Sequence, residues 1–128
     1  SATLKLVSDV ERIGTQAIAI AEIITHFDFN YKGDDILLIE KMSEEAIEMV
    51  KKSIDSFVNK DGTLAANVIK HATIKDTLIH EIKSSENDAS YSLDLLMIAK
   101  YLERIGDHSC NVARCTQYML TGKLTGQE

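Results

Sequence analysis

The 128-residue sequence contains no proline and no tryptophan, and it has only six glycines and 5% aromatic residues. Because proline interrupts helices and punctuates loops, its absence is typical of a chain that is mostly helical. The shortage of aromatic residues argues against a β-sandwich or barrel, whose strands are enriched in them. The sequence therefore predicts an all-α fold.

The chain also lacks an excess of basic residues and any long apolar run. Its 14 lysines and arginines against 20 acidic residues give a net charge of −6, which argues against a dedicated nucleic-acid binder. No run approaches the roughly 18 consecutive apolar residues of a membrane span, and no signal-like segment opens the chain. We expect one compact cytoplasmic domain, or a piece of a larger one.

Two cysteines are present, Cys110 and Cys115, and their spacing of five places them on different faces of a helix. In a reducing compartment we interpret them as small apolar residues rather than as a metal-binding pair. The sequence shows no Ser-His-Asp or Cys-His constellation and no glycine-rich phosphate loop after a strand.

Helical periodicity divides the chain into four predicted helices, at residues 3–25, 35–59, 63–82 and 89–120. Asp34 or Asp35 can cap the second helix, and Gly122 can end the fourth. Since the connections are short, the helices should pack as antiparallel neighbours in a bundle.

An internal repeat links the first and last helices. The segment Glu11-Arg12-Ile13-Gly14 recurs 92 residues later as Glu103-Arg104-Ile105-Gly106. Glycine inside a helix costs about 1 kcal/mol relative to alanine, so each copy needs a reason to keep it. We favour close approach of a neighbouring helix; the alternative is backbone access to a ligand.

Three acidic residues suggest a cation site. Glu103 and Asp107 stack one turn apart on one helix, where two like charges are unfavourable unless a cation lies between them. Asp76 falls on the apolar stripe of the third helix, so it must reach solvent, pair with Arg104 or Lys75, or bind a metal. Such oxygen ligands suit magnesium, calcium, manganese or iron better than zinc or copper. The alternative is a solvated acidic face.

The neighbouring His108 lacks ligand spacing, so we expect it to make a hydrogen bond at the surface rather than to bind a metal. Asn111 can extend the same polar face.

Residues 93–108, Leu-Asp-Leu-Leu-Met-Ile-Ala-Lys-Tyr-Leu-Glu-Arg-Ile-Gly-Asp-His, closely resemble the last helix of the PhoU family of bacterial phosphate transport regulators. The ending at 118–122 resembles that family too. Residues 8–14 are similar to the last helix of its first repeat, and residues 54–61 to the end of the first helix in its second repeat. The resemblance covers nearly the whole chain.

This resemblance implies a fold of two tandem three-helix bundles. Residues 1–28 would be the last helix of an incomplete first repeat, and residues 35–122 a complete second repeat, four helices in all. It implies a negative regulator or adaptor of phosphate uptake and phosphate-starvation signalling, not an enzyme. The implied partners are the ATPase subunit of the phosphate ABC transporter and a phosphate-sensing histidine kinase, through which alone the chain would reach the membrane.

The resemblance also implies a metal, since the family carries Glu/Asp-x-x-x-Asp motifs on its helices. The metal would be iron, zinc, manganese or magnesium. Ala72 and Thr15 stand where the family has acids, so we expect a single weakly held ion or none, rather than a multinuclear cluster. The candidate ligands are Asp76, Glu103, Asp107 and Glu11.

The first helix carries an apolar stripe that must be covered, formed by Ile13, Ala17, Ile20, Ala21 and Ile24. It can fold back onto the rest of the chain, or pair with a second copy. We favour a homodimer.

Other functions remain open on the sequence alone. One is a carboxylate metal-binding helical module with no regulatory partner. A metal-dependent phosphohydrolase would need an activated water beside a basic phosphate clamp, and the sequence shows no such clamp. A helical bundle without any ligand is the simplest reading.

Overall fold

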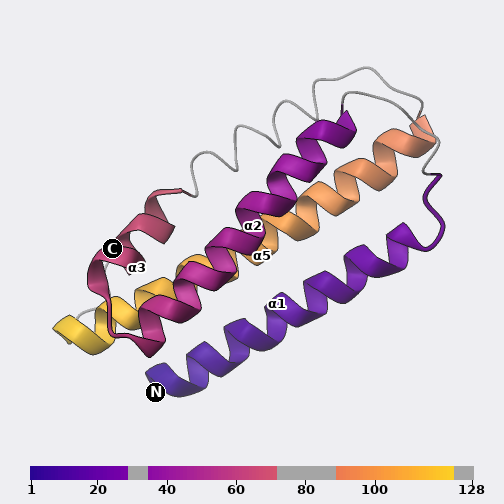
Figure 1. Cartoon of the computed structure of the whole chain (residues 1–128). Helices are drawn as coiled ribbons and strands as arrows, with labels where there is room; N and C mark the ends of the chain where they lie inside the picture. The colour runs from indigo at the N-terminus through magenta and orange to yellow at the C-terminus, as the bar shows by residue number, and fades with distance from the viewer. Residues whose placement is uncertain (29–34, 72–88, 123–128) are drawn as a thin grey trace.

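The computed structural model describes residues 1–28, 35–71 and 89–122, which form four helices and no strand (Figure 1). They are α1 (Ala2–Ile24), α2 (Asp35–Val58), α3 (Gly62–Lys70) and α5 (Ala89–Thr121). The predicted all-α fold is confirmed. Helices α1, α2 and α5 match the predicted runs to within a residue, whereas residues 72–82 of the predicted third run lie outside the described residues.

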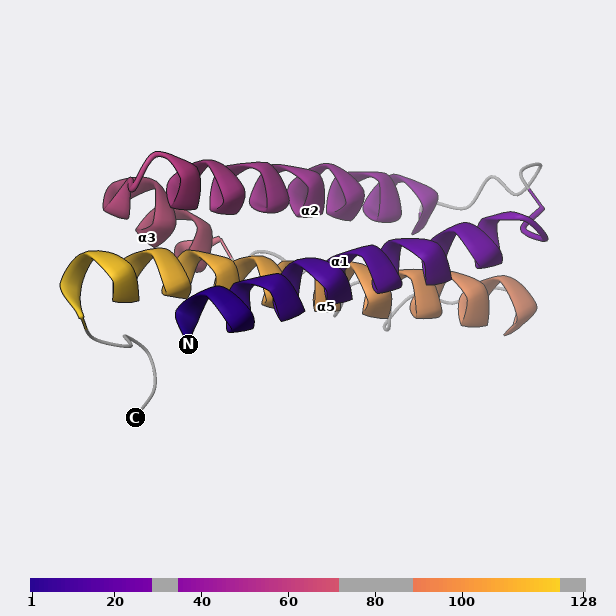
Figure 2. The same ribbon diagram turned by 90° about the horizontal axis from the view of Figure 1, so that it is seen from below.

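Helix α5 is the central element, and the three other described helices pack against it. Helix α1 runs antiparallel to α5, since Asp9 contacts His108 while His26 lies 3.8 Å from Asp94. Helix α2 runs parallel to α5, and α3 turns back along its last part. Figure 1 shows this arrangement, and Figure 2 shows α1 crossing α5 beside α2.

The hydrophobic core consists of two clusters along α5. One lies between α2 and the first half of α5, and its buried members are Met42, Ala46, Ile98, Ala99, Leu102 and Ile105. The other lies where α3 covers α5, and its buried members are Met49, Ala65, Val68, Cys110 and Ala113. The core is therefore built from side chains of one helix surrounded by others, as in other helical bundles.

Small hydroxyl side chains fill the contact between the ends of α2 and α5. Ser53, Ser56 and Ser109 are fully buried, and the hydroxyls of Ser56 and Thr116 share a 3.0 Å hydrogen bond across the two helices. Ser56 and Ser109 also donate to carbonyls of their own helices. Because these groups are satisfied, they can be buried at little cost and still let the backbones approach closely.

Local sequence explains where the helices begin and end. The carboxylate of Asp61 accepts a hydrogen bond from the backbone N–H of Leu64 at 3.0 Å, which caps the start of α3. Lys60 ends α2 in the left-handed region, with the paired backbone bonds of a Schellman motif. Gly122, at φ +71°, ends α5 as predicted, and its N–H donates to the Tyr118 carbonyl.

No helix among the described residues is both long enough and apolar enough to cross a membrane.

Leu95→Ala tests the dependence of the fold on α5. Leu95 is only 1% exposed, so the truncation should lower the free energy of unfolding by about 2–5 kcal/mol. The matched control is Leu93→Ala, two residues earlier on the same helix and 62% exposed, which should change it by less than about 0.5 kcal/mol. Urea denaturation measures both. Equal losses would show that α5 does not pack as described.

Candidate functional site

The two copies of the Glu-Arg-Ile-Gly repeat meet where α1 crosses α5. Ile13 of the first copy and Ile105 of the second line the same cavity and belong to the same apolar cluster. Because the two helices are antiparallel, the repeats face each other head to tail. The two copies of the repeat, which are 92 residues apart in the sequence, thus lie together in the fold.

Gly14 does not have the packing role expected for it. A Cβ built on Gly14 meets nothing within 4 Å, so no neighbouring helix requires glycine there. Its counterpart Gly106 is buried. The prediction of close helix approach is therefore wrong at Gly14, and the described structure gives no packing reason for that glycine.

A buried carboxylate is the central polar group of this crossing. Asp9, the only buried residue of α1, is 3% exposed. It accepts a 2.9 Å hydrogen bond from Nδ1 of His108 and a 3.2 Å bond from Nδ2 of Asn111. Asn111 in turn accepts a 3.4 Å bond from Arg114. The network joins α1 to α5 through Asp9, only one of whose two carboxylate oxygens accepts hydrogen bonds.

The second oxygen of Asp9 is buried without a hydrogen bond among the described residues. Lys5, one turn earlier, forms an ion pair with this oxygen, at an Nζ–Oδ2 distance of 3.8 Å. Gln16, two turns further along α1, likewise has a buried side-chain oxygen with no hydrogen bond within the described part of the chain. Unsatisfied buried acceptors are costly, so these two oxygens reduce the stabilisation that the polar contacts of α1 provide.

Sequence reasoning missed Asp9, although the signal was available. Asp9 lies four residues before Ile13 and seven before Gln16, on the stripe of α1 that faces α5. An acid on an apolar stripe is the same signal that singled out Asp76. His108 makes the expected hydrogen bond, but it is partly buried and its partner is across the helix pair.

Of the predicted metal ligands, Glu103 and Asp107 lie one turn apart on α5, whereas Glu11 lies on α1. Glu103 is half-buried, with Lys100 Nζ 3.6 Å from its carboxylate, and Asp107 is exposed one turn further along α5. Glu11 is exposed; each helical residue turns about 100°, so Glu11 points about 200° away from Asp9 and away from α5. Asp76 lies outside the described residues. Within those residues, no three His, Cys, Asp or Glu side chains come together to hold a metal. The ligand set remains a prediction.

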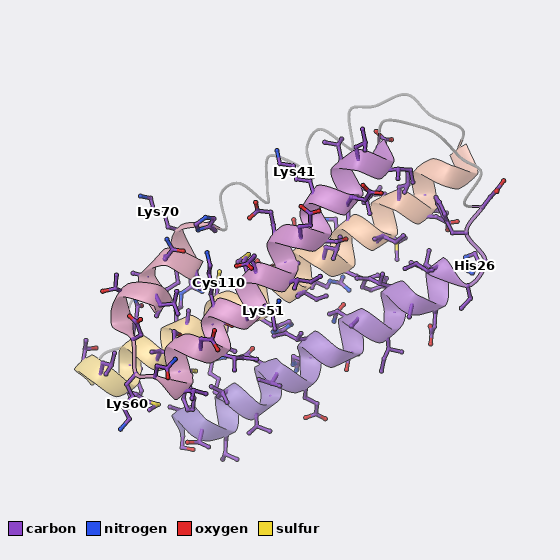
Figure 3. The ribbon with its side chains drawn as sticks, in the orientation of Figure 1. His26, Lys41, Lys51, Lys60, Lys70 and Cys110 are labelled. Atoms are coloured by element: carbon purple, nitrogen blue, oxygen red, sulfur yellow. The ribbon has the colours of Figure 1, made fainter. Side chains whose placement is uncertain are left out.

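Both cysteines are buried and free, as expected. Cys110, labelled in Figure 3, packs beneath α3, where its Sγ lies 4.0 Å from the Val68 carbonyl oxygen. Burial raises the pKa of the Cys115 thiol, the nearby Asp9 carboxylate raises it further, and the Lys5 ammonium partly offsets the rise. Cys115 is therefore held as a neutral thiol, which is a poor nucleophile.

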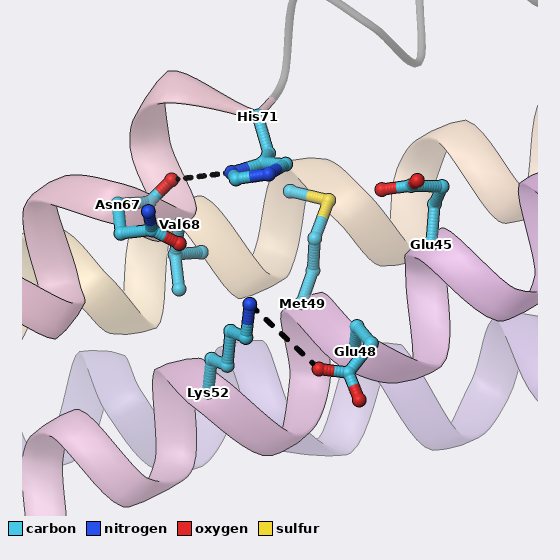
Figure 4. A pocket seen from close by; sticks show the side chains of 7 residues that line it. All are labelled: Glu45, Glu48, Met49, Lys52, Asn67, Val68 and His71. Carbon is cyan, nitrogen blue, oxygen red and sulfur yellow. Dashed lines mark hydrogen bonds and ion pairs between the residues drawn. The ribbon is translucent and has the colours of Figure 1, made fainter.

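A small cavity of about 150 Å³, lined by both polar and apolar side chains, lies between α2 and α3 (Figure 4). Nδ1 of His71 lies 2.9 Å from the Asn67 carbonyl oxygen, and Lys52 forms a 3.8 Å ion pair with Glu48. Glu45 and Met49 complete the wall on α2. The His71 ring and the Lys52–Glu48 pair thus have their partners within the wall of the cavity.

Helix α1 covers only part of its own apolar face. Of the two expected arrangements, the structure shows α1 packed along α5 of the same chain. Ile13 and Ile20 contact the core, but Ala17 and Ile24 line open cavities between α1 and α2. The homodimer remains a prediction.

Comparison with known proteins gives this architecture a family. The family model described as "PhoU domain" matches residues 39–116. The chain is 31% identical over 129 residues to the "Phosphate-specific transport system accessory protein PhoU homolog" of Clostridium acetobutylicum, and 31% identical over 130 residues to that of a Burkholderia species. These matches cover 94% and 92% of this chain.

The fold is similar to the crystal structure of the phosphate transport system regulatory protein PhoU from Streptococcus pneumoniae, with a TM-score of 0.83 and 19% sequence identity. That match covers 99% of this chain and 67% of the other. The chain spans 59% and 55% of the lengths of the two curated relatives above, so it corresponds to little more than half of each.

Asp9→Ala tests the network that joins α1 to α5. The change leaves His108 and Asn111 without their acceptor, so the free energy of unfolding should fall by about 1–3 kcal/mol. Asp55→Ala, an exposed acid on α2, is the control and should cost less than about 0.5 kcal/mol.

Chemical denaturation measures Asp9→Ala and the control Asp55→Ala. It also measures His108→Ala and the double variant Asp9→Ala/His108→Ala, so that the losses from Asp9→Ala and His108→Ala can be compared with their combined loss. The two losses should be non-additive by at least about 0.5 kcal/mol. Additive losses would mean that the two side chains do not stabilise the crossing together.

Proposed function

Because the chain belongs to the PhoU family, we propose that it is a regulatory adaptor that restrains phosphate uptake and phosphate-starvation signalling through protein contacts. The match over residues 39–116 carries this proposal. The names of the curated relatives, accessory proteins of phosphate-specific transport systems, support it.

The proposed partners are the ATPase subunit of a phosphate ABC transporter and a phosphate-sensing histidine kinase. The chain would reach the membrane only by binding them. Large apolar side chains stand exposed on α1 and α2, among them Ile18 at 63% and Ile47 at 55%. Exposed apolar surface of this kind is typical of protein-binding faces, so it supports an adaptor.

A metal-gated version of the adaptor is the second proposal. Glu103 and Asp107 project from neighbouring turns of α5, and Asp76 would supply a third carboxylate. Within the described residues the donor set is incomplete, so the fit depends on Asp76. Iron, zinc, manganese or magnesium bound there would supply positive charge between like-charged side chains. The chain's own contribution is to hold two carboxylates one helical turn apart.

The adaptor proposal predicts direct binding. The purified chain should bind the transporter ATPase subunit or the cytoplasmic part of the kinase with Kd below about 10 μM, the range of transient regulatory contacts. Biolayer interferometry with each partner immobilised measures this, and an unrelated ABC transporter ATPase serves as the control. A folded chain that binds neither partner would contradict the proposal.

The metal proposal predicts that the chain purified without chelator carries about one metal ion, because opposed carboxylates favour a cation between them. Glu103→Gln/Asp107→Asn should remove it. Glu44→Gln/Glu48→Gln, another acid pair one turn apart, should not. Inductively coupled plasma mass spectrometry measures the content. If both double variants match the wild type, Glu103 and Asp107 are not ligands.

A further inference from the structure

An apolar groove runs between α1 and α2, with α5 as its floor. It consists of two cavities of about 340 and 210 Å³ that share Ser43 as a lining residue. Ile13 and Ala17 form the α1 wall of the larger cavity, and Ile20 and Ile24 that of the smaller. Since the two cavities follow one another along α2, they form a single groove.

The rims of this groove are apolar and exposed. On α1, Val10 is 39% exposed and Ile18 63%, and on α2 Ile47 is 55% exposed. The backbones of α1 and α2 make no close contact, because each packs on α5 instead. The surface is therefore a contiguous apolar face with no partner among the described residues, which marks a place for another protein.

The length of the groove fits a short helix. Along α1 it extends from Ile13 to Ile24, which at 1.5 Å per residue is about 17 Å, or three helical turns. Two helices that lie side by side on a third leave a straight channel, which a further helix fills by placing apolar side chains at i, i+3, i+4 and i+7. The occupant is thus an amphipathic helix.

The charges near the groove indicate which kind of amphipathic helix it would bind. Glu40 lines the groove on α2 and Glu44 follows one turn later, while Glu11 and Glu22 stand on the exposed face of α1, on either side of Ile18 along the helix. Among the described residues, Lys51, labelled in Figure 3, is the one basic residue that lines the two cavities. A second copy of this chain would bring these acids against one another. A helix with basic edges would be attracted instead.

We propose that the groove formed by α1, α2 and α5 is the docking site for an amphipathic helix of about three turns that carries apolar residues on one face and lysine or arginine along both edges. This rests on the proposed adaptor function, since it assigns a surface to one of the adaptor's partners.

The probe is a synthetic, fluorescein-labelled helix of about 16 residues, with leucine on one face and lysine at both edges. A second peptide carries glutamate in place of each lysine. Fluorescence anisotropy should show the lysine peptide binding at least about tenfold more tightly than the glutamate peptide, with an affinity that falls as salt is added.

Ala17→Arg places a long side chain in the larger cavity and should weaken binding at least about tenfold. Thr15→Arg is the matched control, because it adds the same charge to an exposed position of α1 that lines neither cavity. Glu40→Lys/Glu44→Lys should reverse the preference between the two peptides. Circular dichroism checks that each variant keeps its helix content.

Equal weakening by Ala17→Arg and Thr15→Arg would overturn the proposal, because the effect would then be charge alone. Light scattering that shows a dimer of the wild-type chain, dissociated by Ala17→Arg, would assign the groove to a second copy instead. If the transporter ATPase or the kinase binds the chain and Ala17→Arg leaves that affinity unchanged, the groove proposal fails while the adaptor proposal stands. If the lysine peptide binds the chain but neither the transporter ATPase nor the kinase does, the adaptor proposal fails while the groove proposal stands.

Discussion

The packing of three helices onto α5 is the interaction on which the rest of the structure depends. At about 1.5 Å per residue, the 33 residues of α5 span about 50 Å, and its successive faces meet α1, α2 and α3. Most fully buried side chains lie on α5 or touch it, from Leu95 near its start to Thr116 near its end. The other described helices take their positions from this one.

Helix α1 is attached differently from the others. It buries one residue, Asp9, and half of its apolar face remains open. A polar contact depends strongly on distance and direction, whereas apolar contact does not. The bonds from His108 and Asn111 therefore fix the crossing of α1 over α5 near the start of α1, and Ile13, Ile20 and Ile23 hold its later turns against the core, while the exposed part of its apolar face remains open.

Much of the fold could be predicted from sequence, because helical periodicity, missing prolines and end signals such as Gly122 act locally. The bounds of α1, α2 and α5 came from those signals. The candidate site was harder, since it depends on which face of α1 meets α5. The family resemblance selected Glu11, which points to solvent, over Asp9, which lies two residues earlier and is buried. Sequence reasoning also assigned Gly14 a packing role that has no neighbour to justify it.

The head-to-tail meeting of the two repeats gives the α1–α5 pair a local two-fold axis. A shift of 92 residues places Tyr101 in the position equivalent to Asp9, and His108 in the position equivalent to Gln16. On one side of the axis a hydrogen bond joins Asp9 to His108, whereas on the equivalent side the side-chain oxygen of Gln16 is buried without a hydrogen bond among the described residues. The two ends of the crossing are therefore held by different contacts: the Asp9 network near the start of α1, and the apolar contacts of Ile20 and Ile23 with the His26–Asp94 pair towards its end. The two ends of the α1–α5 crossing therefore differ chemically, although the repeats that form it are similar in sequence.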